Sequence, residues 1–244
     1  SLDNLGTTLD AQGKQTDFLA ADRESLEIIE SLIGEFPNVP SYQVSLGAKN
    51  CNTGIHLLEN GLPAESLPYF DKAVATLRIV LARDSRIESA RQFLANSYGS
   101  MGRALDKLER HTEAIAALDQ ATEWVAESRK PSFVFMKARV VSKTQPEHAK
   151  SLVEEYLRCD AADPDMRYNA ACFYSHLASI TTDKSDQDRH VQRALQLLTQ
   201  ARDQGFFTPP QVAHFRSDSD FTFLRSHVDF QAFEMSLPIA PPQK

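Results

Sequence analysis

A pattern that recurs every 48 residues constrains this chain more than any other feature of its sequence. The agreeing positions lie in both halves of the unit, and the pairs are Gly54 and Gly102, Leu57 and Leu105, Glu65 and Glu113, Asp71 and Asp119, and Ala73 and Ala121. An earlier unit begins at the same spacing, with Gly6, Leu9 and Gly13 standing before Gly54, Leu57 and Gly61. A fixed period of this length is typical of a fold in which one supersecondary unit stacks on copies of itself.

Each unit predicts two amphipathic helices. Residues 41–60 carry apolar side chains at helical spacing, and Gly61 then supplies a turn. Pro63 suits the first turn of a second helix, where its missing N–H would have no partner in any case. That helix presents one apolar stripe, formed by Leu67, Phe70, Val74, Leu77, Val80 and Leu81. Since two such helices cannot cover both of their stripes alone, neighbouring units must stack.

Two stretches of the chain resemble the tetratricopeptide repeat family. The first is carried by Gly54, Leu57, Gly61, Ser66, Phe70 and Ala73, and the second by Gly102, Leu105, Ala114, Leu118 and Ala121. The family's period is about 34 residues, so longer helices are expected here. Glu109 replaces the glycine of the pattern, and Asn50 stands at its tryptophan position. The resemblance implies an all-α, right-handed α-solenoid of antiparallel helix pairs.

Beyond residue 130 the period fails, but helical patterns continue. The expected elements are a helix over 132–141, a capped turn at 144–147, a helix to about residue 158, a helix that starts at Asp163, a polar loop over 181–188 and a helix over 191–204. The expected organisation is three helix pairs in 1–130, two divergent pairs in 131–205, and a cap and tail of short helices in 206–244. The cap would cover the last apolar face of one continuous solenoid.

A narrower resemblance, to the C-terminal repeat regions of large bacterial serine/threonine protein kinases, lies in the second half. Its segments are Arg167–Cys172, Ala194–Leu198, Gly205-Phe206, Asp218–Asp220 with Leu224, and Asp229-Phe230. The resemblance implies a kinase domain upstream, and a chain that begins with Ser part-way through its first repeat is expected to be a piece of a longer protein. Because the sequence has no Gly-rich phosphate loop, HRD or DFG motif, this segment is not expected to be an enzyme or to hold a cofactor.

Charge and cysteine content argue against several other classes of protein. The formal net charge of −7 disfavours broad binding to nucleic acid or to an anionic membrane surface. No stretch approaches the ~18 apolar residues of a membrane span, and we expect the segment to be cytoplasmic, without direct membrane contact. The three cysteines, Cys51, Cys159 and Cys172, are widely spaced and predict reduced thiols rather than disulfides or a zinc site.

No metal site is predicted near the C-terminus. His214 and His227 lie close to three acidic residues, but their spacing fits no established ligand pattern. The acids precede short helices, where they would act as N-caps, and they are Asp218, Asp220 and Asp229.

The family resemblance places a candidate binding site on the first helix of each unit. In tetratricopeptide arrays these helices line a concave groove that receives peptides, and the residues carried over are Asn52, Ile55, Glu59, Asn96, Ser100, Arg103 and Lys107. The alternative is that these residues are only the solvated sides of helices. The subfamily that clamps the C-terminal carboxylate of chaperones is disfavoured, because Asn52 alone matches the clamp and Asp3 has the wrong sign.

Arg103 and Lys107 would form a local positive site in an otherwise acidic protein. We expect them to engage carboxylate or phosphate groups of a partner, with Asn52 and Asn96 bonding its backbone; the competing hypothesis is that Glu59 neutralises Arg103. The favoured function is therefore a protein- or peptide-binding scaffold, the regulatory or recruiting region of a bacterial serine/threonine kinase. The alternative is a structural module through which the parent protein self-associates as a homo-oligomer.

Overall fold

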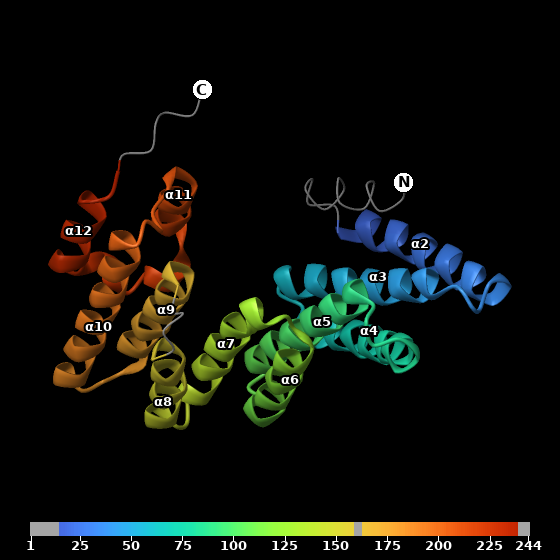
Figure 1. Ribbon diagram of the computed structural model, residues 1–244, viewed down its shortest axis with the longest axis horizontal. Helices are drawn as coiled ribbons and strands as arrows, with labels where there is room; N and C mark the ends of the chain where they lie inside the picture. Colours follow the sequence, from blue (N-terminus) through green and yellow to red (C-terminus); the bar gives the residue numbers. More distant parts are fainter. Residues whose placement is uncertain (1–14, 159–162, 239–244) are drawn as a thin grey trace. The chain divides into compact units, whose positions relative to one another are not determined.

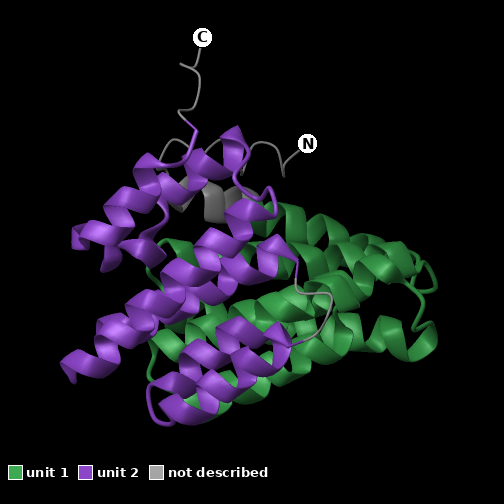
Figure 2. Ribbon diagram, turned by 60° about the vertical axis from the view of Figure 1, so that its left-hand side comes forward, with its two compact units in different colours: residues 1–133 green, residues 134–244 purple. Residues whose placement is uncertain are grey.

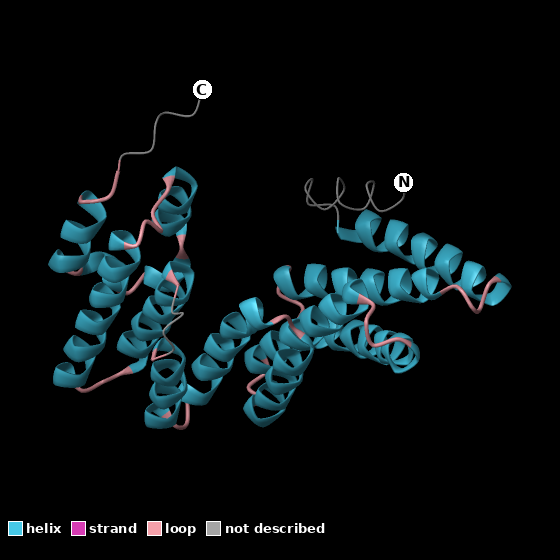
Figure 3. Cartoon of the chain, in the orientation of Figure 1, coloured by secondary structure: helices cyan, strands magenta, loops and turns pink. Residues whose placement is uncertain are grey.

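The structure is a computed structural model that describes residues 15–158 and 163–238. Within those residues every regular element is a helix, which confirms the all-α prediction (Figure 3). The chain divides into two compact units, residues 1–133 and 134–244 (Figure 2).

Helices in unit 1 follow the period of the sequence. The elements are α2 (Gln15–Glu35), α3 (Pro40–Glu59), α4 (Pro63–Arg83), α5 (Glu88–Lys107), α6 (His111–Trp124) and the short 3-10 helix η1 (Glu127–Arg129) (Figure 1). The starts of α3 and α5 lie 48 residues apart, as do the starts of α4 and α6. In each repeat the first helix packs against the second, α3 against α4 and α5 against α6, and α4 also packs against α5 of the next repeat. The predicted stacking of helix pairs is therefore confirmed for these two repeats.

Two glycines allow the helices of each pair to approach closely. A Cβ atom built on Gly54 would lie 2.6 Å from Cε1 of Phe70, and one on Gly102 would lie 2.7 Å from Cγ of Leu118. Both facing side chains are fully buried, so neither can move aside without opening the core. This close approach is the physical reason for glycine at both positions.

The turn between the two helices of each repeat has the same geometry in both repeats. Gly61 has a φ of 79° and Glu109, 48 residues later, has a φ of 61°. The backbone N–H that follows each turn residue donates to the last turn of the first helix, Leu62 to Leu57 and Arg110 to Leu105, both at 2.9 Å. The turn thus keeps its left-handed geometry even where glycine is replaced.

Unit 2 is built mainly on α8 (Pro146–Leu157), α9 (Pro164–Ile180) and α10 (Lys184–Asp203), and its boundary with unit 1 falls within α7 (Lys130–Ser142). Asp163 caps α9 as predicted, since its Oδ1 accepts from the N–H of Met166 at 2.7 Å. The predicted polar loop over 181–188 is wrong from residue 184 onward. There Asp183 accepts from the N–H of Asp186 at 2.9 Å and starts α10 early.

The capped turn expected at residues 144–147 is also wrong. Gln145 precedes α8 and makes no side-chain cap, and the hydroxyl of Thr144 points back to the carbonyl of Val141 instead. Pro146 at the first helical position has no N–H to satisfy, so α8 begins without a capping bond at that residue.

Short helices at the end of unit 2 cover the α9–α10 pair with aromatic rings. They are α11 (Pro209–Ser217), η2 (Ser219–Phe221), η3 (Leu224–Ser226) and α12 (Val228–Met235). Tyr168 of α9 stacks on Phe206 at 4.7 Å between ring centroids and meets Phe221 edge-on at 5.5 Å. Phe215 and Phe230 are fully buried beside them. The tail therefore forms an aromatic core of its own against α9.

Candidate functional site

Six of the seven candidate residues reach the surface on one side of α3 and α5. These helices contact each other in unit 1. At about 100° per residue, Asn96, Ser100, Arg103 and Lys107 fall within about 60° of arc on α5, and their counterparts on α3 do the same. We call the set the α3–α5 face, and its residues are Asn52, Ile55, Glu59, Asn96, Ser100, Arg103 and Lys107.

The residues of the α3–α5 face differ in how far their side chains are exposed. Asn52, Glu59, Arg103 and Lys107 are exposed, and Ile55 and Asn96 are half-buried. Ser100 is only 7% exposed. Its hydroxyl therefore belongs to the packing below the face rather than to the surface.

Two contacts describe the surroundings of the candidates. A Cβ on Gly99 would lie 2.3 Å from Cε1 of Phe133, so the first turn of α7 packs against α5 at Gly99. Ile55 packs against the core formed by Leu58, Phe70 and Ala104. Ile55 thus offers the surface an apolar edge of that core.

Arg103 and Lys107 are exposed cations on α5. Within residues 15–158 and 163–238 neither forms an ion pair, and the alternative pairing of Arg103 with Glu59 is absent there. The nearby acid Asp106 is instead 3.1 Å from Nδ1 of His111. Two like charges one helical turn apart repel each other by a few tenths of a kcal/mol. An anionic group placed between them would relieve this repulsion.

Arg129 is a further cation on this face that sequence reasoning missed. Its Nη2 donates to Oδ1 of Asn96 at 3.1 Å. The side chain comes from η1, is exposed, and lies 33 residues from its partner in sequence. The repeat does not indicate the contact, because the equivalent position 48 residues earlier is the buried Leu81 of α4.

A buried ion pair fastens α2 to α3. Nζ of Lys49 lies 2.5 Å from Oδ1 of Asp22, and the hydroxyl of Thr53 donates to the same carboxylate. All three residues are buried. The pair joins the first two described helices, and because the charges of Asp22 and Lys49 compensate each other its role is structural.

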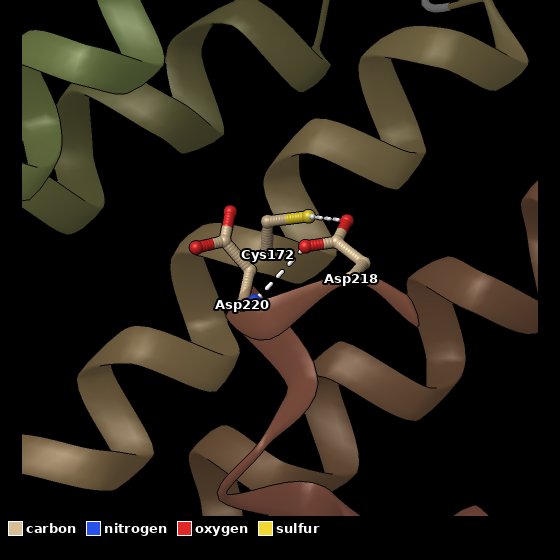
Figure 4. A group of neighbouring side chains, drawn as sticks. All are labelled: Cys172, Asp218 and Asp220. Atoms are coloured by element: carbon tan, nitrogen blue, oxygen red, sulfur yellow. Dashed lines mark hydrogen bonds between the residues drawn. The ribbon is translucent and has the colours of Figure 1, made fainter. Parts of the chain in front are cut away.

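Three potential metal ligands gather where the tail meets α9 (Figure 4). The thiol of Cys172 and the carboxylates of Asp218 and Asp220 lie within 4.8 Å of one another. Each carboxylate already has a protein partner: Tyr168 donates to Asp218 at 2.6 Å, and Arg139 donates to Asp220 at 2.8 Å.

The thiol also has a partner within the group, because Sγ of Cys172 donates to Oδ2 of Asp218 at 4.0 Å. Burial, and then the charges of Asp220 and Asp218, raise the pKa of Cys172 well above its usual value, which keeps the thiol in the protonated form that donates this bond. The group is therefore better explained as a hydrogen-bonded joint between α7, α9 and the tail.

Only one of the three predicted N-caps in the tail is confirmed. Asp218 accepts from the N–H of Asp220 at 2.9 Å and caps η2. Asp220 lies inside η2, where it pairs with Arg139, and Asp229 lies in the first turn of α12 after the cap residue His227. The cap prediction is wrong for these two because η2 and α12 begin at Ser219 and Val228, each two residues before the start that a cap at Asp220 or Asp229 would give.

One family model matches the beginning of the chain. It is described as "Tetratricopeptide repeat" and matches residues 1–38, which confirms the resemblance to that family. No curated protein matches the sequence.

Solved structures are similar over most of the chain, but only distantly. The crystal structure of TTC0263, a thermophilic TPR protein of Thermus thermophilus, is 18% identical with a TM-score of 0.42, over 88% of this chain and 96% of that one. The crystal structure of BtubC (BKLC) from P. vanneervenii is 18% identical with a TM-score of 0.46, over 92% and 94%. Likenesses this weak identify no function. In the described part of the chain, no helix is long and apolar enough to cross a membrane.

Proposed function

We propose, from the premise that this chain is a tetratricopeptide-repeat protein, that unit 1 binds a protein or peptide partner through the α3–α5 face. The observation that carries the proposal is the pair of exposed cations, Arg103 and Lys107, which have no counter-ion among the described residues. Holding two like charges together without compensation stabilises nothing in the unit itself. A partner that brings a carboxylate or phosphate group would satisfy both.

The partner's chemistry follows from the residues around these cations. Arg103 can offer two parallel N–H donors to one carboxylate or phosphate, whereas Lys107 acts as a point charge. Asn52, exposed on α3, can bond the backbone of an extended segment. Ile55 adds a small apolar contact between them.

In the parent protein, the segment would serve as the regulatory or recruiting region of a bacterial serine/threonine kinase and work in the cytoplasm. This part of the proposal rests on the sequence alone, through Arg167–Cys172 and the tail segments. The segment would bring a substrate or regulator to the kinase without itself transferring phosphate.

The test is to recover a partner by affinity capture and to measure its binding to Arg103→Ala and Arg103→Glu variants. Truncation should weaken binding by about 1.5–3 kcal/mol, the usual range for a hydrogen bond to a charged group, and charge reversal should weaken it further. Arg83→Glu, at an exposed position in the last turn of α4, is the matched control and should leave affinity unchanged. Unchanged affinity in both folded Arg103 variants would reject the proposal.

Self-association is a second candidate function, favoured by the end of unit 2. Val228 and Met235 on α12 are 78% and 79% exposed, which is unusual for large apolar side chains. Light scattering on the wild type and on a Val228→Ser, Met235→Ser double variant separates the possibilities. A dimer that the double variant abolishes supports self-association through α12, and a monomeric wild type rejects it.

A further inference from the structure

We infer that the partner of the α3–α5 face is an extended segment with two anionic side chains about three residues apart, one held by Arg103 and the other by Arg129. The inference rests on the proposed function and goes beyond it, because it adds a second anchor and a spacing. It follows from the position of Arg129, whose guanidinium is bonded to Asn96.

Asn96 fixes Arg129 on the face but leaves most of its donors available. The Asn96 amide oxygen accepts one N–H, from Nη2 at 3.1 Å, and a guanidinium carries five N–H donors. Arg129 is exposed and forms no ion pair within the described residues. A side chain held in place in this way loses less conformational entropy when it binds an anion.

Neighbouring acids do not neutralise Arg129. Glu127, in the same short helix, is 2.6 Å from Nζ of Lys130 and is thereby engaged elsewhere. Lys107 is a compact point charge, whereas each arginine can offer two parallel N–H donors to one anionic group. Arg103 and Arg129 are therefore the two stronger anchors, and Lys107 is the weaker one.

Helix geometry sets the spacing between the two anchors. Asn96, which marks the position of Arg129, lies seven residues before Arg103 and on the same side of α5. Seven residues of α-helix rise by about 10 Å. A peptide in the extended polyproline II conformation has three residues per turn and advances by about 3.1 Å per residue, so side chains three residues apart lie on the same side of it and about 9 Å apart. One anionic side chain can then meet each arginine without bending the peptide.

The test uses the whole chain and labelled synthetic peptides of glycine, alanine and serine that carry two glutamates. The glutamates stand adjacent, three residues apart or seven residues apart, and a fourth peptide carries phosphoserines three residues apart. Binding is measured by fluorescence anisotropy at low salt for the wild type and for Arg103→Gln, Arg129→Gln and Asn96→Ala. Arg83→Gln on α4 is the control, since it removes an exposed positive charge outside the face.

The peptide with glutamates three residues apart should bind at least about fivefold more tightly than the adjacent and seven-residue versions. Arg103→Gln and Arg129→Gln should each lower affinity about tenfold and remove the dependence on spacing, since a charged hydrogen bond contributes about 1.5 kcal/mol or more. Asn96→Ala should lower affinity less, because Arg129 stays charged but is no longer held. Tighter binding of the phosphoserine peptide would identify phosphate as the natural group, and equal binding would identify carboxylate.

Equal affinity for all spacings, no effect of Arg129→Gln, or no binding of any peptide would each overturn the inference. The proposed function is rejected by a different result, namely a recovered partner that binds the Arg103→Glu variant with unchanged affinity. If that partner responds to Arg103→Glu while the peptides show no preference for spacing, the face binds a partner but not by the two-anchor arrangement.

Discussion

Glu109 has the same left-handed backbone conformation as Gly61, the residue 48 positions before it. The φ angles are 61° and 79°, and within the described residues Glu109 is the non-glycine residue with a positive φ. The left-handed conformation costs an ordinary residue about 1–2 kcal/mol. The packing of α5 and α6 therefore holds Glu109 in a backbone conformation that is unfavourable for a non-glycine residue.

Replacing Glu109 by glycine should stabilise unit 1 by about 0.5–1 kcal/mol. Relief of the left-handed strain exceeds the extra entropy that glycine loses on folding, which is about 0.5–1 kcal/mol. Urea denaturation of Glu109→Gly measures the change, with Gly61→Ala expected to shift in the opposite direction. Destabilisation by Glu109→Gly would mean that the carboxylate makes a contact more important than the backbone strain.

A leucine at Gly54 should destabilise the second repeat by about 1–3 kcal/mol. Its Cβ alone would lie 2.6 Å from Phe70, which is fully buried and cannot move aside. Thermal unfolding of Gly54→Leu, beside a Gly34→Leu control at a position with nothing within 4 Å, measures the effect. If Gly54→Leu unfolds at the same temperature as the wild type, the close contact between α3 and α4 does not exist in solution.

Replacing one partner of the buried Asp22–Lys49 ion pair should lower the free energy of unfolding more than replacing both partners. Lys49→Met leaves the carboxylate of Asp22 buried without its cation, and a loss of about 3–5 kcal/mol is expected. Adding Asp22→Leu should restore part of that stability, since no buried charge then remains. A double-mutant cycle by urea denaturation measures the coupling. Additive effects of the two substitutions would show that the side chains do not interact.

The free energy of unfolding should fall in mildly acidic solution partly because of His190. Burial, and then the charge of Lys150, lower the pKa of this imidazole. The unfolded chain, with a pKa of about 6.5, therefore takes up the proton more readily than the folded one. The contribution of His190 is complete above about pH 6.5 and is lost as the pH falls below it.

His190→Gln tests this assignment. Its urea midpoint should decline less between about pH 7 and pH 5 than that of the wild type, because glutamine does not titrate. A His148→Gln variant, at an exposed site on α8, is the control for removing a histidine. Parallel pH profiles for all three proteins would exclude His190 as the source.

Mg-ATP should not bind the isolated chain. The sequence has no Gly-rich phosphate loop, and no HRD or DFG motif, to hold nucleotide and metal. Isothermal titration calorimetry with Mg-ATP checks this expectation, and a saturable heat with defined stoichiometry would contradict it.

Sequence predicted most reliably what the 48-residue period fixes. The boundaries of α3 and α4, and their recurrence in α5 and α6, follow from helical spacing and from the turn at Gly61, which are local properties of each repeat. The start of α10 was missed, because a single cap at Asp183 outweighs the polar composition that follows it.

The candidate face was only partly predictable, for a different reason. Repeat positions indicate which side of a helix a residue lies on, so Arg103 and Lys107 were found. They do not indicate how much of that side the rest of the chain covers, so the burial of Ser100 was missed. The contact between Asn96 and Arg129 involves the short helix η1, and the equivalent residue of the preceding repeat, Leu81, gives no sign of it.

The last residue of α6 gives this protein a built-in spectroscopic reporter. Trp124 is the single tryptophan of the chain and lies in unit 1, half-buried, with an indole N–H that has no hydrogen-bond acceptor among the described residues. Its fluorescence emission therefore follows the opening of unit 1, whereas far-ultraviolet circular dichroism follows the helices of both units. Coincident transitions by the two signals would reveal a single cooperative chain, and separate ones would reveal two bodies that melt independently.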